Sequence, residues 1–117
     1  MTTAPERLSK TARAHVLNVN NERLLSAASA WEISIKWALG KLALPAHPSE
    51  FVPEQLALTK TYPLAVQHSH ALRVAHLPRH HNDPFDRILI AQAQIEKIPI
   101  LTSDPEFKPY DIDVIPA

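Results

Sequence analysis

The chain has 117 residues, and its 12 Lys and Arg balance 12 Asp and Glu to a formal charge of zero. This length allows one domain with a real core, spanning residues 1–117, and is too short for two. A balanced charge removes the simplest argument for nucleic-acid binding, which would be a strongly basic chain. The absence of cysteine excludes disulfides and thiolate metal sites, and a single glycine excludes Gly-rich phosphate loops.

The cellular location of the protein is predicted from two features that were sought in the sequence, a membrane helix and a secretory signal. No apolar run approaches the ~20 residues of a membrane helix, and no secretory signal opens the chain. We therefore expect a cytoplasmic protein that does not contact a membrane.

The first half of the chain predicts helices separated by a short strand. The expected elements are a helix over residues 5–19, a strand over 23–27, a helix over 30–39 and a helix over 48–59. Ser26 or Ser29 would cap the second of these helices, and Gly40 would close it. Ser49 would cap the last.

The second half predicts an alternation of helices and buried strands. The expected elements are strands over residues 62–66, 98–102 and 112–115, helices over 68–75 and 84–97, and a helical turn over 104–107. Asp83 and Pro84 form a strong helix start, with Asp83 as the cap. The apolar run at residues 98–101 suits a strand buried on both faces. Together these elements predict an α/β domain with a mostly parallel sheet.

Three carboxylates fall where such a sheet would place a site. Glu32 and Asp86 lie in the expected first turns of two helices, and Asp104 follows the strand at residues 98–102. Ligands of open α/β sheets bind outside the carboxyl ends of the strands, so the three could converge there. Oxygen ligands suit Mg²⁺ or Mn²⁺, which can lower the pKa of a bound water. The inferred chemistry is metal-dependent phosphodiester hydrolysis.

Each carboxylate also has a purely structural interpretation. Glu32 and Lys36 form an i,i+4 pair, and acidic residues near helix N-termini are favoured by the helix dipole. Asp83 and Asp86 have the spacing of a capping box, and Asp104 precedes Pro105 as a cap would. A generic α/β domain whose carboxylates only cap helices therefore stays open as an alternative.

The histidines do not form a recognisable metal motif. His80 and His81 are adjacent in sequence, and His68, His70 and His76 lack the i,i+4 spacing of zinc sites. We expect them to be solvated loop residues.

Three segments, in order along the chain, resemble PIN-domain toxins of the VapC type. The second family motif resembles residues 26–36 with 40–42, the third resembles residues 81–93, and the fourth resembles residues 101–104 with Phe107 and Tyr110. The resemblance implies a PIN-like three-layer α/β domain with a mostly parallel sheet. It implies a Mg²⁺- or Mn²⁺-dependent endoribonuclease of a bacterial toxin–antitoxin pair.

The resemblance also implies roles for particular residues and partners. Glu32, Asp86 and Asp104 match the family's acidic positions, and are expected to be both catalytic and metal-binding. Asp83 matches a family position too, but we assign it to capping. The expected partners are a cognate antitoxin protein, an RNA substrate and a second copy of the chain in a homodimer.

One family feature has no counterpart in this sequence. Family members open with an apolar central strand that ends in an aspartate, the first metal ligand, whereas residues 4–27 already resemble the stretch after that strand. We therefore expect the N-terminal central strand and its acidic residue to be missing. The alternative function is a truncated, catalytically inactive PIN-like domain that binds an antitoxin or itself.

Overall fold

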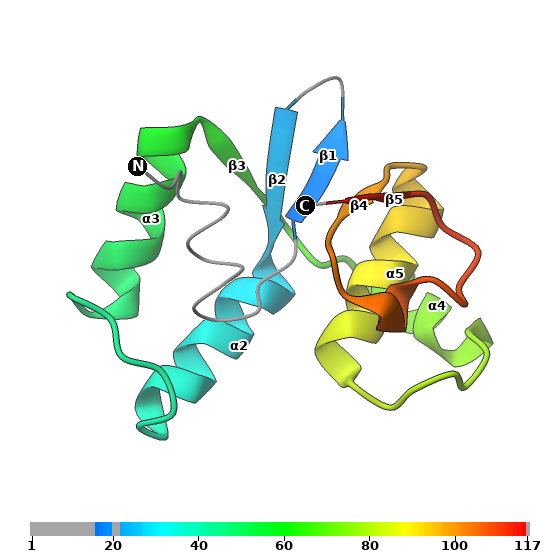
Figure 1. Ribbon diagram of the computed structural model, residues 1–117, viewed down its shortest axis with the longest axis horizontal. Helices are drawn as coiled ribbons and strands as arrows, with labels where there is room; N and C mark the ends of the chain where they lie inside the picture. The colour runs from blue at the N-terminus through cyan, green and yellow to red at the C-terminus, as the bar shows by residue number, and fades with distance from the viewer. Residues whose placement is uncertain (1–15, 20–21, 117) are drawn as a thin grey trace.

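In the part of the chain that the structure describes, five strands form one mixed sheet at the centre of the molecule (Figure 1). The structure is a computed structural model and describes residues 16–19 and 22–116. The strands are β1 (Val16–Val19), β2 (Glu22–Ser26), β3 (Thr61–Leu64), β4 (Ile100–Leu101) and β5 (Val114–Ile115), in the order β3-β2-β1-β4-β5. β2 pairs with β3, and β4 with β5, in parallel, while β1 is antiparallel to both of its neighbours. Four strands therefore run in one direction, which confirms the mostly parallel sheet.

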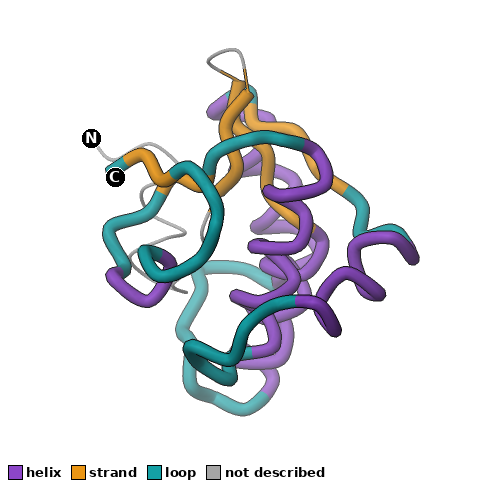
Figure 2. The backbone as a smooth tube through the Cα atoms, turned by 90° about the vertical axis from the view of Figure 1, so that its right-hand side faces the viewer, coloured by secondary structure: helices purple, strands orange, loops and turns teal. Residues whose placement is uncertain are grey.

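Helices cover both faces of this sheet. They are α2 (Ala27–Ala38), α3 (Pro48–Thr59), α4 (His68–Arg73) and α5 (Pro84–Glu96), with 3₁₀ turns η1 (Val74–His76) and η2 (Pro105–Phe107). α2 and α3 lie on one side of the strands, and α4 and α5 on the other (Figure 1). Figure 2 views the molecule from the α4 and α5 side, where the helices run alongside the strands. The three-layer α/β arrangement predicted from the sequence is confirmed.

Two apolar clusters fill the spaces between the sheet and its helices. One includes Ile33, Phe51 and Val52, from α2 and α3. The other includes Leu89 and Ile90 of α5. Side chains of this kind contribute about 1.5–3 kcal/mol each when they are fully buried. The central strands contribute to both clusters, so the sheet connects the two layers.

β1 is the central strand of the sheet, between β2 and β4. The helix predicted over residues 5–19 is wrong at residues 16–19, and its earlier part lies outside the described residues. Val16 faces the α2 and α3 cluster, whereas Leu17 faces the α5 cluster, and both are almost fully buried. Adjacent residues that point to opposite faces fit the period of a strand. β1 is therefore a strand because it is buried on both faces and paired with a strand on each side, although its apolar residues also fit the spacing of a helix.

The helix ends confirm some of the predicted caps and correct others. α2 begins three residues earlier than expected, because Ser26 caps it by accepting a hydrogen bond from the Ala28 amide at 3.1 Å. Gly40 ends α2 with φ of 73°, and the amides of Gly40 and Lys41 bond back to the last turn as in a Schellman motif. α3 spans the predicted residues, but His47 rather than Ser49 is its cap.

Candidate active site

Glu32 lies at the carboxyl edge of the sheet because α2 follows β2 without a loop. Since α2 starts at Ala27, Glu32 falls in the second turn rather than in the predicted first turn. Glu32 is only 8% exposed, and its Oε2 lies 2.9 Å from Lys36 Nζ. The i,i+4 pair expected from the sequence is therefore present, and it holds one oxygen of a largely buried carboxylate.

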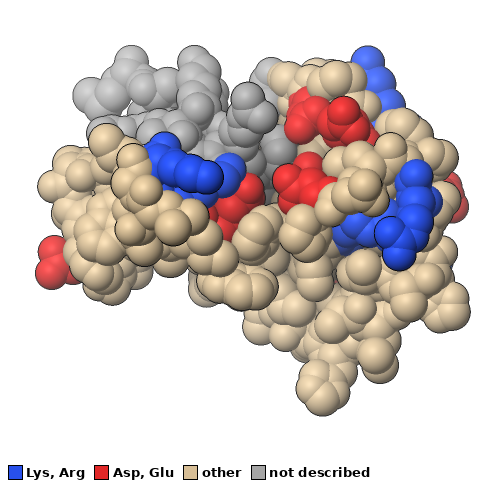
Figure 3. Space-filling view, turned by 90° about the horizontal axis from the view of Figure 1, so that it is seen from below, with Lys and Arg blue, Asp and Glu red and all other residues tan. Residues whose placement is uncertain are grey.

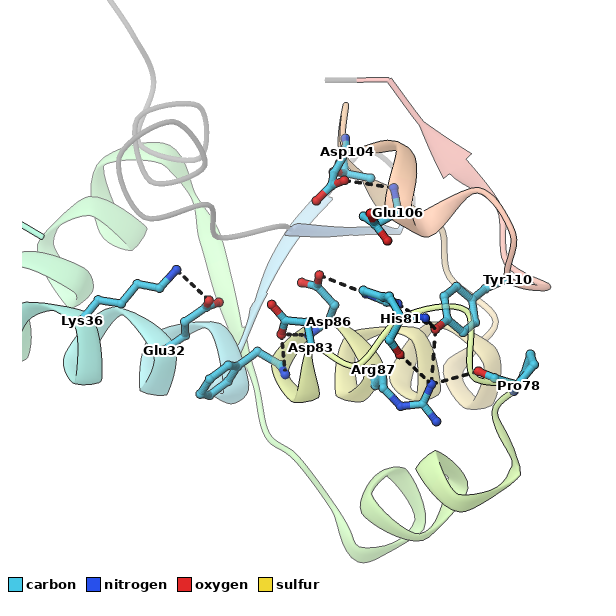
Figure 4. Close-up of polar contacts among 12 residues, drawn as sticks. Glu32, Lys36, Pro78, His81, Asp83, Asp86, Arg87, Asp104, Glu106 and Tyr110 are labelled. Atoms are coloured by element: carbon cyan, nitrogen blue, oxygen red, sulfur yellow. Dashed lines mark hydrogen bonds and ion pairs between the residues drawn. The ribbon is translucent and has the colours of Figure 1, made fainter. Parts of the chain in front are cut away.

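Asp86 is the most buried of the three predicted carboxylates, at 7% exposure. It occupies position N3 of α5, where Asp83 is the N-cap and Pro84 the first helical residue. Asp83 Oδ1 accepts hydrogen bonds from the amides of Phe85 at 2.9 Å and Asp86 at 3.1 Å. This confirms Asp83 as a cap. It also fixes the backbone from which the Asp86 side chain projects (Figure 4).

The electrostatic environment of Asp86 disfavours its charge. Its pKa is raised from the usual 3.8 to about 7, chiefly by burial and then by the negative charges of Asp83 and, to a smaller extent, Glu32. The hydrogen bond and charge of His81 act in the opposite direction, lowering the pKa. Glu32 and Asp86, which are far apart in sequence, therefore share one electrostatic site. Such a perturbed carboxyl group is typical of functional sites.

Asp104 reaches the same region from the loop after β4. Its Oδ1 accepts a hydrogen bond from the Glu106 amide at 2.9 Å and caps η2, while its own amide donates to Thr102 Oγ1 at 3.0 Å. Figure 4 shows Asp104 across from Asp86, on the side where Glu106 also lies. Through the bond to the Glu106 amide, Asp104 has the cap role that the sequence also allowed.

Acidic side chains gather on one face of the molecule. Figure 3 shows Asp and Glu side chains around the middle of this face, with Lys and Arg side chains to either side. In the part of the chain that the structure describes, no three His, Asp or Glu side chains form a group that could hold a metal ion. Glu32, Asp86 and Asp104 thus share one edge without forming a closed ligand set. Their carboxylate oxygens remain the donor type that Mg²⁺ and Mn²⁺ prefer.

A set of hydrogen-bonded residues that was not predicted from the sequence lies behind Asp86. His81 Nε2 lies 3.2 Å from Asp86 Oδ2, and His81 Nδ1 lies 2.7 Å from the Tyr110 hydroxyl. Arg87 is buried and donates to Tyr110 Oη at 3.2 Å and to Pro78 O at 2.9 Å. His81 stands five residues before Asp86, and this short spacing was a signal that could have linked the two.

His70 is a second histidine that is not solvated, although the sequence placed it in the solvated group. It is 1% exposed, and its Nδ1 accepts a hydrogen bond from the Gln67 amide at 3.0 Å. Its Nε2 lies 2.9 Å from Glu96 Oε2 on α5. The prediction of solvated histidines is therefore wrong for His70, whose ring contacts α5. It is also wrong for His81, whose side chain is 12% exposed and whose ring contacts Asp86, Phe107 and Tyr110.

The profile of the PIN domain matches residues 3–113. The chain therefore belongs to the PIN-domain family, as the three motifs suggested. It is 50% identical to ribonuclease VapC16 of Mycobacterium tuberculosis over 58 residues, which are 50% of this chain and 41% of that protein. No solved structure matches the chain. Within the described ranges, no helix has both the length and the apolar character needed to cross a membrane.

Proposed function

We propose that this chain is a VapC-type endoribonuclease, the toxin of a bacterial toxin–antitoxin pair that acts in the cytoplasm. The observation that carries the proposal is the buried Asp86 carboxyl, placed by the Asp83 cap beside Glu32 at the carboxyl edge of the sheet. Membership of the PIN-domain family and the likeness to a ribonuclease support it. A cognate antitoxin and a second copy of the chain are the proposed protein partners.

We assign Glu32, Asp86 and Asp104 to both catalysis and the binding of Mg²⁺ or Mn²⁺. The raised pKa of Asp86 fits this assignment, because it reflects negative charge crowded into a buried place. A divalent ion, when bound, supplies an activated water and offsets charge on a phosphodiester. Asp83 would keep Asp86 at the start of α5, and Lys36 would keep Glu32 in place.

Asp86→Asn tests this function most directly. We expect the purified chain to cleave RNA with millimolar Mg²⁺ or Mn²⁺, and Asp86→Asn to lower the rate by about 100-fold or more, within the range for a positioned catalytic group. The amide keeps the size of the side chain but removes its negative charge. The matched control is Asp111→Asn, which removes one charge at an exposed residue and should leave the rate unchanged.

Equal cleavage by Asp86→Asn and the unmodified chain would contradict the catalytic assignment. A folded chain that cleaves no RNA with either ion would instead favour the inactive binding module. Binding of a candidate antitoxin then remains measurable without any cleavage.

A further inference from the structure

The contacts behind Asp86 form one continuous chain of hydrogen bonds. It runs from the buried guanidinium of Arg87 to the Tyr110 hydroxyl, from there to the His81 ring, and from the ring to Asp86 (Figure 4). Tyr110 is 4% exposed and the His81 side chain is 12% exposed, so water has little access to these bonds. Buried polar contacts of this kind hold side chains in fixed orientations.

The direction of each hydrogen bond follows from the donors around Tyr110. Its hydroxyl oxygen accepts from Arg87 Nη1 at 3.2 Å and from the His81 backbone amide at 3.2 Å. A hydroxyl has two acceptor positions and one hydrogen, so both acceptor positions are then used. The remaining and shortest contact, 2.7 Å to His81 Nδ1, must be donated by the hydroxyl. His81 Nδ1 is therefore an acceptor.

The state of the other ring nitrogen is then determined. A neutral imidazole carries its hydrogen on one nitrogen only. Since Nδ1 accepts, the hydrogen is on Nε2, which lies 3.2 Å from Asp86 Oδ2 and donates to it. We propose that Arg87 and Tyr110 fix His81 as an Nε2–H donor, and that His81 thereby orients the Asp86 carboxylate for RNA cleavage. His81 is a positioning residue, because it acts through Asp86.

Arg87 is suited to hold this arrangement rather than to bind a phosphate. Its Nη2 donates to the carbonyls of Val74 at 3.3 Å and Leu77 at 3.4 Å, and its Nη1 to that of Pro78. These bonds fasten the loop that carries His81 to α5. The guanidinium is thereby anchored by backbone groups, so the position of the Tyr110 hydroxyl is anchored too.

The tautomer of His81 can be measured without any enzymatic activity. Long-range ¹H–¹⁵N spectra of the ¹⁵N-labelled chain at pH 8 separate protonated from unprotonated ring nitrogens, and the His81→Gln spectrum identifies the His81 signals among the seven histidines. We expect Nε2–H in the unmodified chain and a mixture of tautomers in Tyr110→Phe, which lacks the hydroxyl. An Nδ1–H tautomer of His81 in the unmodified chain would overturn the inference, whatever the cleavage activity of any variant.

The expected effect of His81 on RNA cleavage rests on the proposed function. Two substitutions of His81 test this effect. The amide of Gln reaches about as far as Nε2, whereas that of Asn reaches only as far as Nδ1. We expect His81→Asn to lower the cleavage rate about 10- to 100-fold, as losses of supporting contacts do, and His81→Gln to retain more of it. The control His80→Gln changes an exposed ring that contacts Tyr110 only edge-on, at 4.9 Å between centroids.

Failure of the inference about His81 and failure of the proposed function would give different results. Equal rates for His81→Asn and His81→Gln, with both variants folded by thermal melting, would overturn the role of the Nε2–H donor. A chain that cleaves no RNA would contradict the proposed function, while its spectra would still decide whether His81 is held as an Nε2–H donor.

Discussion

The buried carboxyl of Asp86 should make the stability of the protein depend on pH. Its pKa in the folded chain is about 7, against 3.8 for an ordinary Asp, because burial and the charge of Asp83 favour the protonated form. A group whose pKa is raised by folding stabilises the fold fully below its unfolded pKa, and this stabilisation is lost as pH rises through the folded pKa. We therefore expect the contribution of Asp86 to fall between about pH 4 and pH 7.

Asp86→Asn should remove this dependence, since an amide stays neutral. One pKa unit corresponds to about 1.4 kcal/mol, so we expect the stability of the variant relative to the unmodified chain to rise by at least that amount from pH 5 to pH 8. Urea unfolding at the two pH values measures the difference. Asp111→Asn, at an exposed carboxyl, should show no such change. A relative stability of Asp86→Asn that is the same at both pH values would contradict the argument.

Among the described residues, three helices end in the left-handed conformation, and one of the three has glycine there. Gly40 has φ of 73°, whereas Lys60 and Lys97 have φ of 54° and 57°. A side chain in this conformation costs about 1–2 kcal/mol, and the extra freedom of glycine in the unfolded chain costs about 0.5–1 kcal/mol. Lys97→Gly should therefore stabilise the chain by up to about 1 kcal/mol, measured by urea unfolding.

A matched substitution separates this effect from a general effect of glycine. Lys108 is also exposed and ends η2, but its φ is −62°. Lys108→Gly gains no relief of strain and should destabilise the chain by a few tenths of a kcal/mol or more. If Lys97→Gly and Lys108→Gly changed stability by the same amount, backbone strain at Lys97 would not be the cause.

Elements defined by local signals were predictable, and elements defined by distant contacts were not. Asp83 and Pro84 mark the start of α5 within two residues, and Gly40 marks the end of α2. The apolar residues of β1 fit a helix or a strand equally well, and only pairing with β2 and β4 decides between them. The contact of His81 with Tyr110 spans 29 positions, so no local pattern could show it.

At the scale of the whole molecule, β1 links the two layers of helices. Leu17 packs with the α5 cluster and Val16 with the α2 and α3 cluster, so neither layer can be removed without exposing this strand. Sharing of a buried central strand favours a single cooperative unfolding transition. A single transition would make the midpoint of unfolding a usable measure of ligand binding to the intact chain.

Mn²⁺ should raise that midpoint if the acidic edge binds the ion. A ligand at about 100 times its dissociation constant adds about 2.7 kcal/mol, which corresponds to a shift of several degrees for a chain of this length. We expect the shift with millimolar Mn²⁺ in the unmodified chain and in Asp111→Asn, and no shift in Asp86→Ala, which loses a proposed ligand. A cooperative transition that Mn²⁺ does not move would argue against the metal assignment. An equal shift in Asp86→Ala would place the bound ion away from Asp86.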